Sequence, residues 1–391
     1  MANKKQSVLL LSVMETWGGG EEVLLNLASR VQGFCFYLAT PPGQAAEIFK
    51  QHRLTVFEAA SLKKIYRKKN RWTGSEKLKA IISIASAVLP LILFLKRKKI
   101  SLIVANGNFA ALFALPLVFL FKIKLVVIQH LLYDQDAYEG KLLNTIAKYA
   151  DAFVCVSKSV LANIKPFFSE QKPRQSMVIY NGISLPVNKQ NAEGNNVPHE
   201  EIRFAIIGSI IREKGHDKII EVFSELAKDF SQCRLFIFGN PRENESSQFF
   251  YQSLQEKLNY FNITDKIFFK GYVADKEELY QQVDVVINYS MVPESFSLTV
   301  LEALAYQKLV IAANEGGPAE IIQHGVNGYL VEPRNKKALL QIMMNVVTQI
   351  GYESMDEIRK NGRKTVEEKF SLNQFAEEYK NLFDNVLSGN K

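Results

Sequence analysis

Short, continuous apolar runs alternate along the chain with longer segments in which apolar residues recur at helical spacing. The runs have the length of buried strands. They predict strands at residues 7–13, 34–40, 101–105, 124–130, 152–157, 177–181, 203–208, 234–239, 266–271, 285–289 and 309–313. Among the segments that predict helices are 23–30, 298–305 and the tail at 353–387. This alternation is typical of parallel sheets covered by helices.

The alternation stops at residues 186–200, which are polar and lack periodicity, and then restarts. A chain of 391 residues is long enough for two domains with full cores. We therefore predict a first domain at 1–185, a linker at 186–200 and a second domain at 201–369. The C-terminal helix, at about 370–391, is expected to pack back on the first domain.

Two apolar segments of the first half need separate treatment. Residues 80–95 contain no charge and are followed by four basic residues, and residues 109–121 are apolar throughout. Both fall short of the 18 or more residues expected of a membrane-spanning helix. We predict core helices at both. The N-terminus, residues 1–13, has lysines and then a short apolar run, which predicts a first strand rather than a signal peptide.

Charge is divided unequally between the halves. Residues 1–185 hold 25 Lys and Arg against 11 Asp and Glu, a net of +14, whereas the remainder holds 23 against 29, a net of −6. An anionic partner is therefore expected opposite the first half. A cluster at 63–72 mixes aromatic and basic residues, which fits either an interfacial loop on anionic lipid or a solvated basic loop. No nucleic-acid-binding motif accompanies these charges, which argues against a nucleic-acid partner.

Cys35, Cys155 and Cys233 each lie inside an apolar, strand-like run. An odd number of cysteines so placed predicts reduced core thiols and a cytosolic setting. No Cys and His cluster has the spacing of a metal site, so we expect no metal.

The chemistry centres on residues 293–302, Pro-Glu-Ser-Phe-Ser-Leu-Thr-Val-Leu-Glu, which enter the helix predicted at 298–305. Ser297 is predicted as the N-cap, with its hydroxyl accepting from backbone N–H groups one turn on. A helix N-terminus suits a phosphate group, and carboxylates accept hydrogen bonds from sugar hydroxyls. The stretch therefore suits a nucleotide-sugar, with the sugar at Glu294 and the ribose at Glu302. The alternative is a solvated pair of glutamates around an ordinary strand, loop and helix.

This stretch resembles the Glu-x7-Glu motif of the retaining GT-B glycosyltransferases known as group 1 or family 4. The resemblance implies that Glu294 contacts the donor sugar and that Glu302 contacts the ribose. It also implies that the helix start at Ser297, Leu298 and Thr299 lies against the donor diphosphate.

Residues 207–215, Ile-Gly-Ser-Ile-Ile-Arg-Glu-Lys-Gly, follow a predicted strand and open a helix. They resemble the phosphate loop of the same family, Gly-Arg-x4-Lys-Gly. Lys214 matches the lysine that grips the donor phosphates, but Ser209 stands at the arginine position. Arg212 is the candidate to replace that arginine. Without the rest of the pattern, Lys214 would be read as a helix-surface lysine.

The first half carries two further matches. Gly18, Gly19 and Glu21 match the Gly-Gly-x-Glu loop of the family, whose glycines let the backbone approach the donor phosphates; we assign Glu21 to the acceptor side. His130 ends the strand predicted at 124–130 and matches a family histidine close to the transferred sugar and the acceptor. The resemblance implies that it supports the transition state near the anomeric carbon. A structural role is the alternative for a histidine at a strand end.

Other matches follow in family order. Residues 270–273 resemble the strand end whose backbone meets the nucleotide base, which implicates Tyr272 and Val273. Residues 178–183 resemble the segment before the interdomain linker, with Ser184 where an Asp is usual. Residues 316–328 resemble the motif after the donor helix. Together the matches cover most of residues 7–333.

The resemblance implies an α/β protein of the GT-B class, with two Rossmann-like domains whose parallel sheets face across a cleft. It implies a retaining hexosyltransferase that needs no metal or other cofactor and uses a nucleotide-sugar, with a UDP-sugar expected. The charge of the first half suggests a lipid-linked or anionic glycan acceptor. We expect a role in cell-surface polysaccharide biosynthesis and a cytoplasmic protein held peripherally at the inner face of the plasma membrane.

Two alternatives remain open at this point. The first is another enzyme on the same fold, either a nucleotide-sugar epimerase or a transferase with a soluble acceptor. The second is a GT-B-like subunit that binds membrane or a partner and has lost catalysis. Ser209 favours the second alternative, whereas Glu294, Glu302, Lys214 and His130 speak against it.

Overall fold

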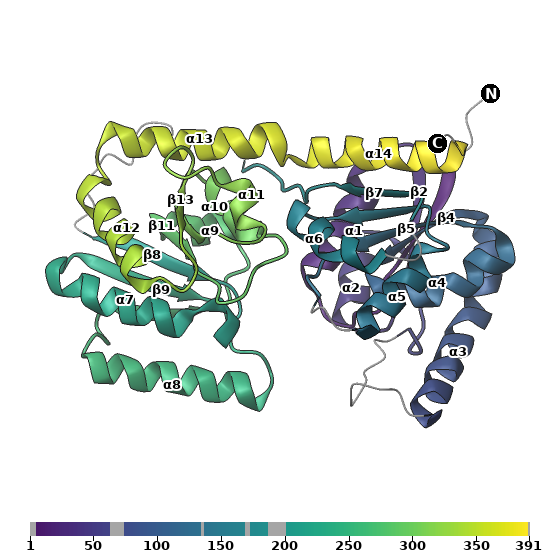
Figure 1. Ribbon diagram of the computed structural model, residues 1–391, viewed down its shortest axis with the longest axis horizontal. Helices are drawn as coiled ribbons and strands as arrows, with labels where there is room; N and C mark the ends of the chain where they lie inside the picture. Colours follow the sequence, from purple (N-terminus) through teal and green to yellow (C-terminus); the bar gives the residue numbers. More distant parts are fainter. Residues whose placement is uncertain (1–4, 63–73, 134–136, 169–172, 187–200, 390–391) are drawn as a thin grey trace. The chain divides into compact units, whose positions relative to one another are not determined.

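The computed structural model describes residues 5–62, 74–133, 137–168, 173–186 and 201–389. The chain forms two compact units, Met1–Gly182 with Leu372–Lys391 and Ile183–Ser371 (Figure 1). The basic cluster at 63–72 and the predicted linker from residue 187 onward lie outside the described residues.

The first unit has, among its described residues, a seven-stranded parallel sheet in the order β3-β2-β1-β4-β5-β6-β7. The middles of its central strands are apolar because helices cover both faces, and residues 8–11 are fully buried. The strands are β1 (Gln6–Leu11), β2 (Phe34–Thr40), β3 (Thr55–Glu58), β4 (Ile100–Asn106), β5 (Lys124–Gln129), β6 (Ala152–Cys155) and β7 (Gln175–Val178).

The helices of this unit are α1 (Gly19–Arg30), α2 (Gln44–Gln51), α3 (Gly74–Lys98), α4 (Asn108–Phe121), α5 (Ala137–Ala147), α6 (Lys158–Ile164), the 3-10 turn η1 (Lys165–Phe168) and α14 (Leu372–Ser388). Helix α4 packs on α3, α5 and the central strands, and α1 packs on α14. The ring of Phe383 on α14 lies 5.5 Å from that of Phe34, so the end of the chain contributes to this core.

The second unit has, within the described part of the chain, a six-stranded parallel sheet in the order β10-β9-β8-β11-β12-β13. Its strands are β8 (Ile202–Ile207), β9 (Cys233–Phe238), β10 (Ile267–Gly271), β11 (Val285–Asn288), β12 (Leu309–Ala313) and β13 (Tyr329–Val331). Its helices are η2 (Arg212–Lys214), α7 (His216–Asp229), α8 (Glu245–Phe261), α9 (Lys276–Gln281), α10 (Leu298–Ala305), α11 (Pro318–Ile321), α12 (Lys336–Gln349) and α13 (Glu353–Lys369).

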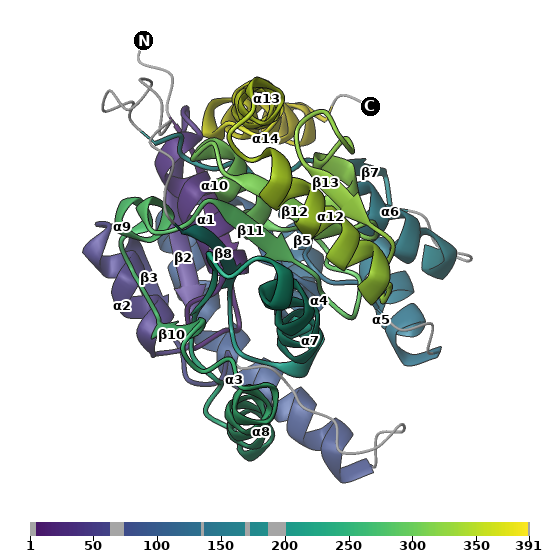
Figure 2. The ribbon, with the colours of Figure 1, turned by 90° about the vertical axis from the view of Figure 1, so that its left-hand side faces the viewer.

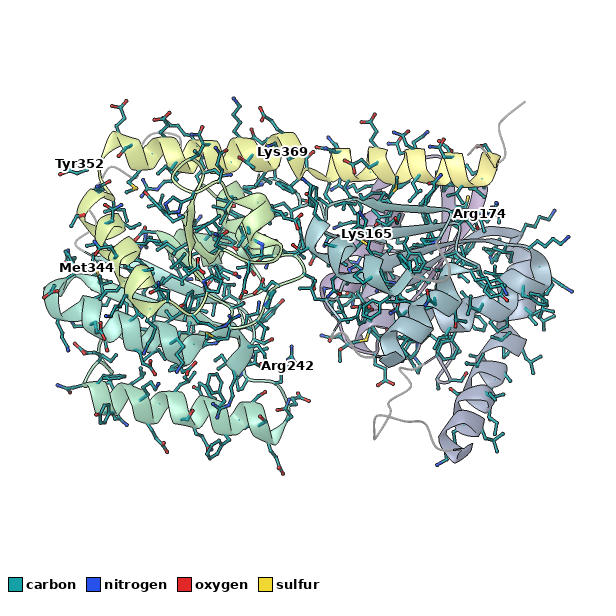
Figure 3. All side chains as sticks on the ribbon, in the orientation of Figure 1. Lys165, Arg174, Arg242, Met344, Tyr352 and Lys369 are labelled. Carbon is teal, nitrogen blue, oxygen red and sulfur yellow. The ribbon has the colours of Figure 1, made fainter. Side chains whose placement is uncertain are left out.

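Two groups of helices cover this second sheet. Helix α7 packs on β9, α8 and α12, whereas α10 packs on β11, β12 and α13. Figure 2 shows the sheet between the two groups. Tyr352 and Lys369, labelled in Figure 3, mark the two ends of α13.

Both sheets change direction at one point. From β1 the chain moves outward to β2 and β3, and from β4 it moves outward the other way; β8 and β11 play the same roles in the second sheet. In open α/β sheets, ligands bind outside the carboxyl ends of the strands at such a switch point. The loops after β1, β4, β8 and β11 are therefore where a site is expected.

The predicted alternation of strands and helices is confirmed, and β2, α10 and β12 have the predicted bounds. Two short strands, β3 and β13, were not predicted. The three cysteines are unpaired, as predicted, and lie in β2, β6 and β9.

The prediction of core helices at 80–95 and 109–121 is only partly correct. The side of α3 that bears Ala87, Leu91 and Leu95 is buried, but its outer side is exposed and apolar, as is the end of α4. Periodicity cannot distinguish a helix buried all round from one with an exposed apolar face. No helix among the described residues is long and apolar enough to cross a membrane.

Candidate active site

Glu294 lies in the loop between β11 and α10, and the backbone around it is fixed from outside the loop. The N–H of Gly317 donates to the carbonyl oxygen of Glu294 at 2.7 Å. Gly316 has a φ of +64°, and a Cβ there would lie 2.2 Å from that same oxygen. A side chain at Gly316 would therefore displace the loop. This close approach explains why glycine occupies position 316.

The carboxylate of Glu294 is held by one cation and by neutral hydrogen-bond donors. Lys214 Nζ lies 2.5 Å from Glu294 Oε1, Asn288 Nδ2 donates to Oε1 at 3.3 Å, and the Ser290 hydroxyl donates to the same oxygen. Burial acts to raise the pKa of Glu294, but the positive charge of Lys214 and the hydrogen bonds outweigh it, so the pKa is lowered. Glu294 is therefore charged at neutral pH.

Ser297 is the N-cap residue of α10, as predicted, but its predicted capping hydrogen bond is wrong. Its hydroxyl makes no bond to the first turn and instead accepts from Asn288 Nδ2 at 3.2 Å. Ser297 and Asn288 are both buried, so the amide of Asn288 needs an acceptor where no water reaches it. The N–H groups of the first turn, at Leu298 and Thr299, are therefore left without this cap and form the positive end of the helix.

Lys214 reaches Glu294, 80 residues along the chain, because the loops after two neighbouring strands are tied together. The N–H of Met291 donates to the carbonyl oxygen of Glu213 at 2.7 Å, which fixes η2 against the loop after β11. The Arg212 guanidinium lies 5.0 Å from the ring centroid of Phe250 on α8. Ser209, at the family's arginine position, is partly buried in the same loop.

Glu302 lies on α10, farther from the loop. Its Oε2 lies 2.9 Å from Lys276 Nζ and 3.3 Å from the Tyr280 hydroxyl. The ring of Tyr280 stacks on Tyr306 at 4.6 Å between centroids, which fixes the hydroxyl in place. Tyr272 is exposed just after β10.

The first unit carries a second polar network at its own switch point. His130 Nε2 lies 2.6 Å from Asn106 Oδ1, and Asn106 Nδ2 donates to Glu21 Oε1 at 3.1 Å. The Ser12 hydroxyl donates to the same carboxylate oxygen at 3.0 Å. A Cβ at position 20 would lie 3.0 Å from Asn106 Nδ2, so Gly20 leaves room for this amide.

This network determines how the imidazole of His130 is protonated. Because the NH₂ of Asn106 faces Glu21, its oxygen faces His130 and accepts from Nε2–H, which leaves Nδ1 as an acceptor. Burial lowers the pKa of His130 to about 4, so the ring is neutral at neutral pH. Burial also raises the pKa of Glu21, which is nearly enclosed.

The structure thus brings Lys214 and Glu294 together in one unit, and Glu21 and His130 together in the other. Gly18 is the N-cap of α1 and Gly19 its first residue, which places both at the loop after β1. Several partners were not singled out from the sequence: Ser12, Asn106, Lys276, Tyr280, Asn288 and Ser290. Ser12, Asn106 and Asn288 lie at or just beyond the carboxyl end of a predicted strand, and that position is the signal that could have found them.

Two family profiles together match most of this chain. The profile described as "Glycosyltransferase Family 4" matches residues 17–186, and that described as "Glycosyl transferases group 1" matches residues 187–365. An uncharacterized glycosyltransferase of Methanocaldococcus jannaschii is 26% identical over 264 residues, 64% of this chain and 65% of that protein. The lipopolysaccharide 1,2-N-acetylglucosaminetransferase of Salmonella typhimurium is 26% identical over 67% of this chain and 68% of its own. The aligned region thus spans about two thirds of these relatives.

The fold has a close match among solved structures. The crystal structure of the Anabaena protein HepE in complex with UDP superposes with a TM-score of 0.78, at 19% identity, over 98% of this chain and 100% of that one. The same protein has been solved with UDP-glucose. The two family profiles, which together account for residues 17–365, and this shared architecture show that the chain belongs to the group 1 glycosyltransferases of the GT-B fold.

Proposed function

We propose that this chain is a retaining glycosyltransferase that moves a sugar from a UDP-sugar to a lipid-linked or glycan acceptor in cell-surface polysaccharide biosynthesis. The observation that carries the proposal is the Lys214–Glu294 ion pair at the switch point beside the uncapped start of α10. A lysine suits a diphosphate, and a carboxylate suits sugar hydroxyls. The UDP-bound Anabaena neighbour supports the nucleotide, and the Salmonella relative supports the pathway class.

In the donor complex that we propose, Lys214 exchanges Glu294 for the diphosphate. Arg212 would have to leave the ring of Phe250 to take part, which would give up a contact of about 0.5–1 kcal/mol. A charge-assisted hydrogen bond to phosphate would offset that loss. Ser209 adds a hydroxyl donor at the same loop.

The rest of the donor follows the same sheet edge. Glu302 would accept from the ribose hydroxyls, and the backbone at Tyr272 and Val273 would meet the base. Gly18 and Gly19 would let the backbone of the first unit approach the phosphates. Glu21 is hydrogen-bonded to Ser12 and Asn106, so we propose that it serves the acceptor side through Asn106 and His130.

In the proposed transfer, the bond from the anomeric carbon to the diphosphate oxygen breaks and a bond to the acceptor oxygen forms on the same face. The acceptor proton passes to the leaving diphosphate. Lys214 and the start of α10 stabilise the charge that develops on the diphosphate, which is electrostatic catalysis. Neutral His130 supports the reacting carbon with its side chain or backbone.

We also propose, from the net positive charge of the first half, that the protein associates peripherally with the inner face of the plasma membrane. A lipid-linked acceptor would be found there. We also propose that the reaction needs no metal, because Lys214 and the helix start supply the positive charge that a metal would otherwise supply.

The first test is thermal unfolding of the purified chain with UDP, GDP, ADP and CMP. At about a hundred times its dissociation constant, a ligand stabilises the folded protein by roughly 2.7 kcal/mol. We expect UDP to raise the midpoint in the wild type, with the shift reduced in Glu302→Ala and kept in Glu225→Ala, an exposed glutamate on α7. If no nucleotide raises the midpoint, the proposal is wrong. A second test distinguishes a transferase from an inactive subunit. If the purified chain hydrolyses a UDP-sugar and Glu294→Ala does not, the chain is an active enzyme.

A further inference from the structure

The outer side of α3 carries a continuous row of exposed apolar residues. Leu78, Ile82, Leu89 and Leu93 have exposed fractions of 58%, 58%, 66% and 73%, and we call them the α3 stripe. Their spacing of four, seven and four residues places them on one face of the helix. The stripe spans 16 residues, from Leu78 to Leu93, or about 22 Å along the helix. Single exposed leucines need no explanation, but a row of this length indicates a binding surface.

The end of α4 extends this surface. Phe119 and Leu120 are 72% and 59% exposed. Lys96 Nζ on α3 lies 5.4 Å from the ring centroid of Phe121, so the last turns of the two helices lie side by side. In Figure 1, α3 extends away from the sheet of its own unit.

Basic residues flank the stripe at both ends. Between residues 77 and 133 the sequence has eight Lys and Arg residues and no Asp or Glu. Lys79, Lys96, Arg97, Lys99 and Lys122 are exposed. An apolar face with a cationic rim complements an anionic lipid surface, where apolar side chains enter the acyl boundary and cations meet the headgroups.

We propose that the α3 stripe and the end of α4 form the surface by which this chain docks on an anionic lipid bilayer. The inference gives the proposed membrane association a location, and it does not depend on the donor or on catalysis. A second copy of the chain is a poorer occupant, because a two-fold interface would bring the like-charged rims of two copies together.

The test is co-sedimentation of the purified full chain with phosphatidylcholine vesicles, with and without phosphatidylglycerol. We expect binding to the anionic vesicles, and a loss of at least tenfold in Leu89→Glu/Leu93→Glu. Lys79→Gln/Arg97→Gln should weaken binding about 25-fold, since each basic residue near the surface contributes about fivefold. The matched control is Tyr260→Glu, an 83% exposed residue on α8, which should bind as the wild type does.

Each other outcome overturns the inference in a distinct way. Equal binding to neutral vesicles would show that the surface does not require anionic lipid. Wild-type binding by Leu89→Glu/Leu93→Glu would show that another surface of the chain binds the vesicles. A wild-type dimer that the stripe variant abolishes, seen by light scattering, would make a second copy the occupant. No vesicle binding at all would refute the association as well, while the UDP-induced rise in midpoint would still test the transferase independently.

Discussion

Replacing Lys214 with methionine tests the central ion pair of the proposed site. The side chain of Glu294 is 12% exposed and that of Lys214 is 30% exposed. Breaking a fully buried pair by removing one partner costs about 3–5 kcal/mol. Because Lys214 is partly solvated, and Ser290 and Asn288 still donate to the carboxylate, we expect Lys214→Met to lose about 2 kcal/mol of unfolding free energy at pH 7.

The pH dependence gives this loss a signature. In the wild type the pKa of Glu294 lies below its ordinary value of 4.5, so its contribution to stability is present above pH 4.5 and is lost as the pH falls through the folded pKa. Without Lys214, burial remains and the pKa of Glu294 should rise above 4.5. The variant then relieves its buried charge by protonation as the pH falls, and its difference from the wild type should shrink between pH 7 and pH 4.

Urea unfolding at both pH values measures this difference. Lys228→Met, an exposed lysine on α7, is the matched control and should change stability by less than about 0.5 kcal/mol. Glu294→Gln and the double variant complete a cycle in which we expect a coupling of at least about 1 kcal/mol. If Lys214→Met is as stable as Lys228→Met at pH 7, or if its loss is the same at pH 4, solvent screens the pair and the reasoning fails.

Three further predictions concern neighbouring groups. Gly316→Ala should displace the loop before α10 and lower both stability and the UDP-induced rise in midpoint; Gly351→Ala, which has open space around it, should do neither. His216 is fully buried, and burial lowers its pKa to about 4 from 6.5, so the unfolded chain takes up its proton first and stability falls as the pH drops below about 6.5. Urea unfolding should show a loss of about 2 kcal/mol from this residue between pH 7 and pH 5, absent in His216→Leu. Asn106→Ala should release the Nε2–H of His130 and the Oε1 of Glu21. We expect kcat to fall about tenfold, with the donor KM unchanged, because His130 loses the hydrogen bond that orients its ring. An equal rise in KM would instead indicate a general distortion of the loop.

Much of the fold could be predicted because its strands are buried on both faces. Such strands read as continuous apolar runs, and β2 and β12 were located to the residue for this reason. β3 and β13 were not predicted because they are edge strands of four and three residues, which are too short to show a clear hydrophobic pattern. The exposed apolar side of α3 was not predicted, for a different reason. An apolar residue has the same hydropathy whether it is buried in the protein or exposed on its surface.

The candidate site was predicted in its charges and missed in its neutral partners. Glu294 and Lys214 could be named because the stretches around them resemble motifs of the family, and their carboxylate and cation suit a sugar and a diphosphate. The predicted capping bond of Ser297 was wrong because helix-capping rules consider only the helix and its first residues. In the structure the Ser297 hydroxyl instead accepts a hydrogen bond from buried Asn288, nine residues earlier. Asn106 was missed because its role lies in two contacts with residues distant along the chain, Glu21 on α1 and His130 just after β5.

The ion pair suggests why a UDP-sugar would bind more tightly than UDP alone. In this structure Lys214 and Glu294 neutralise each other, so neither has an unmet charge that a ligand could satisfy at no cost. A diphosphate that takes Lys214 leaves the carboxylate of Glu294 with neutral donors alone, and burial then acts against its charge. Sugar hydroxyls placed at Glu294 would restore the missing hydrogen bonds. Binding of the diphosphate and binding of the sugar are thereby coupled through the Lys214–Glu294 pair. A nucleotide that lacks the sugar would give Lys214 a new partner but would leave Glu294 without one.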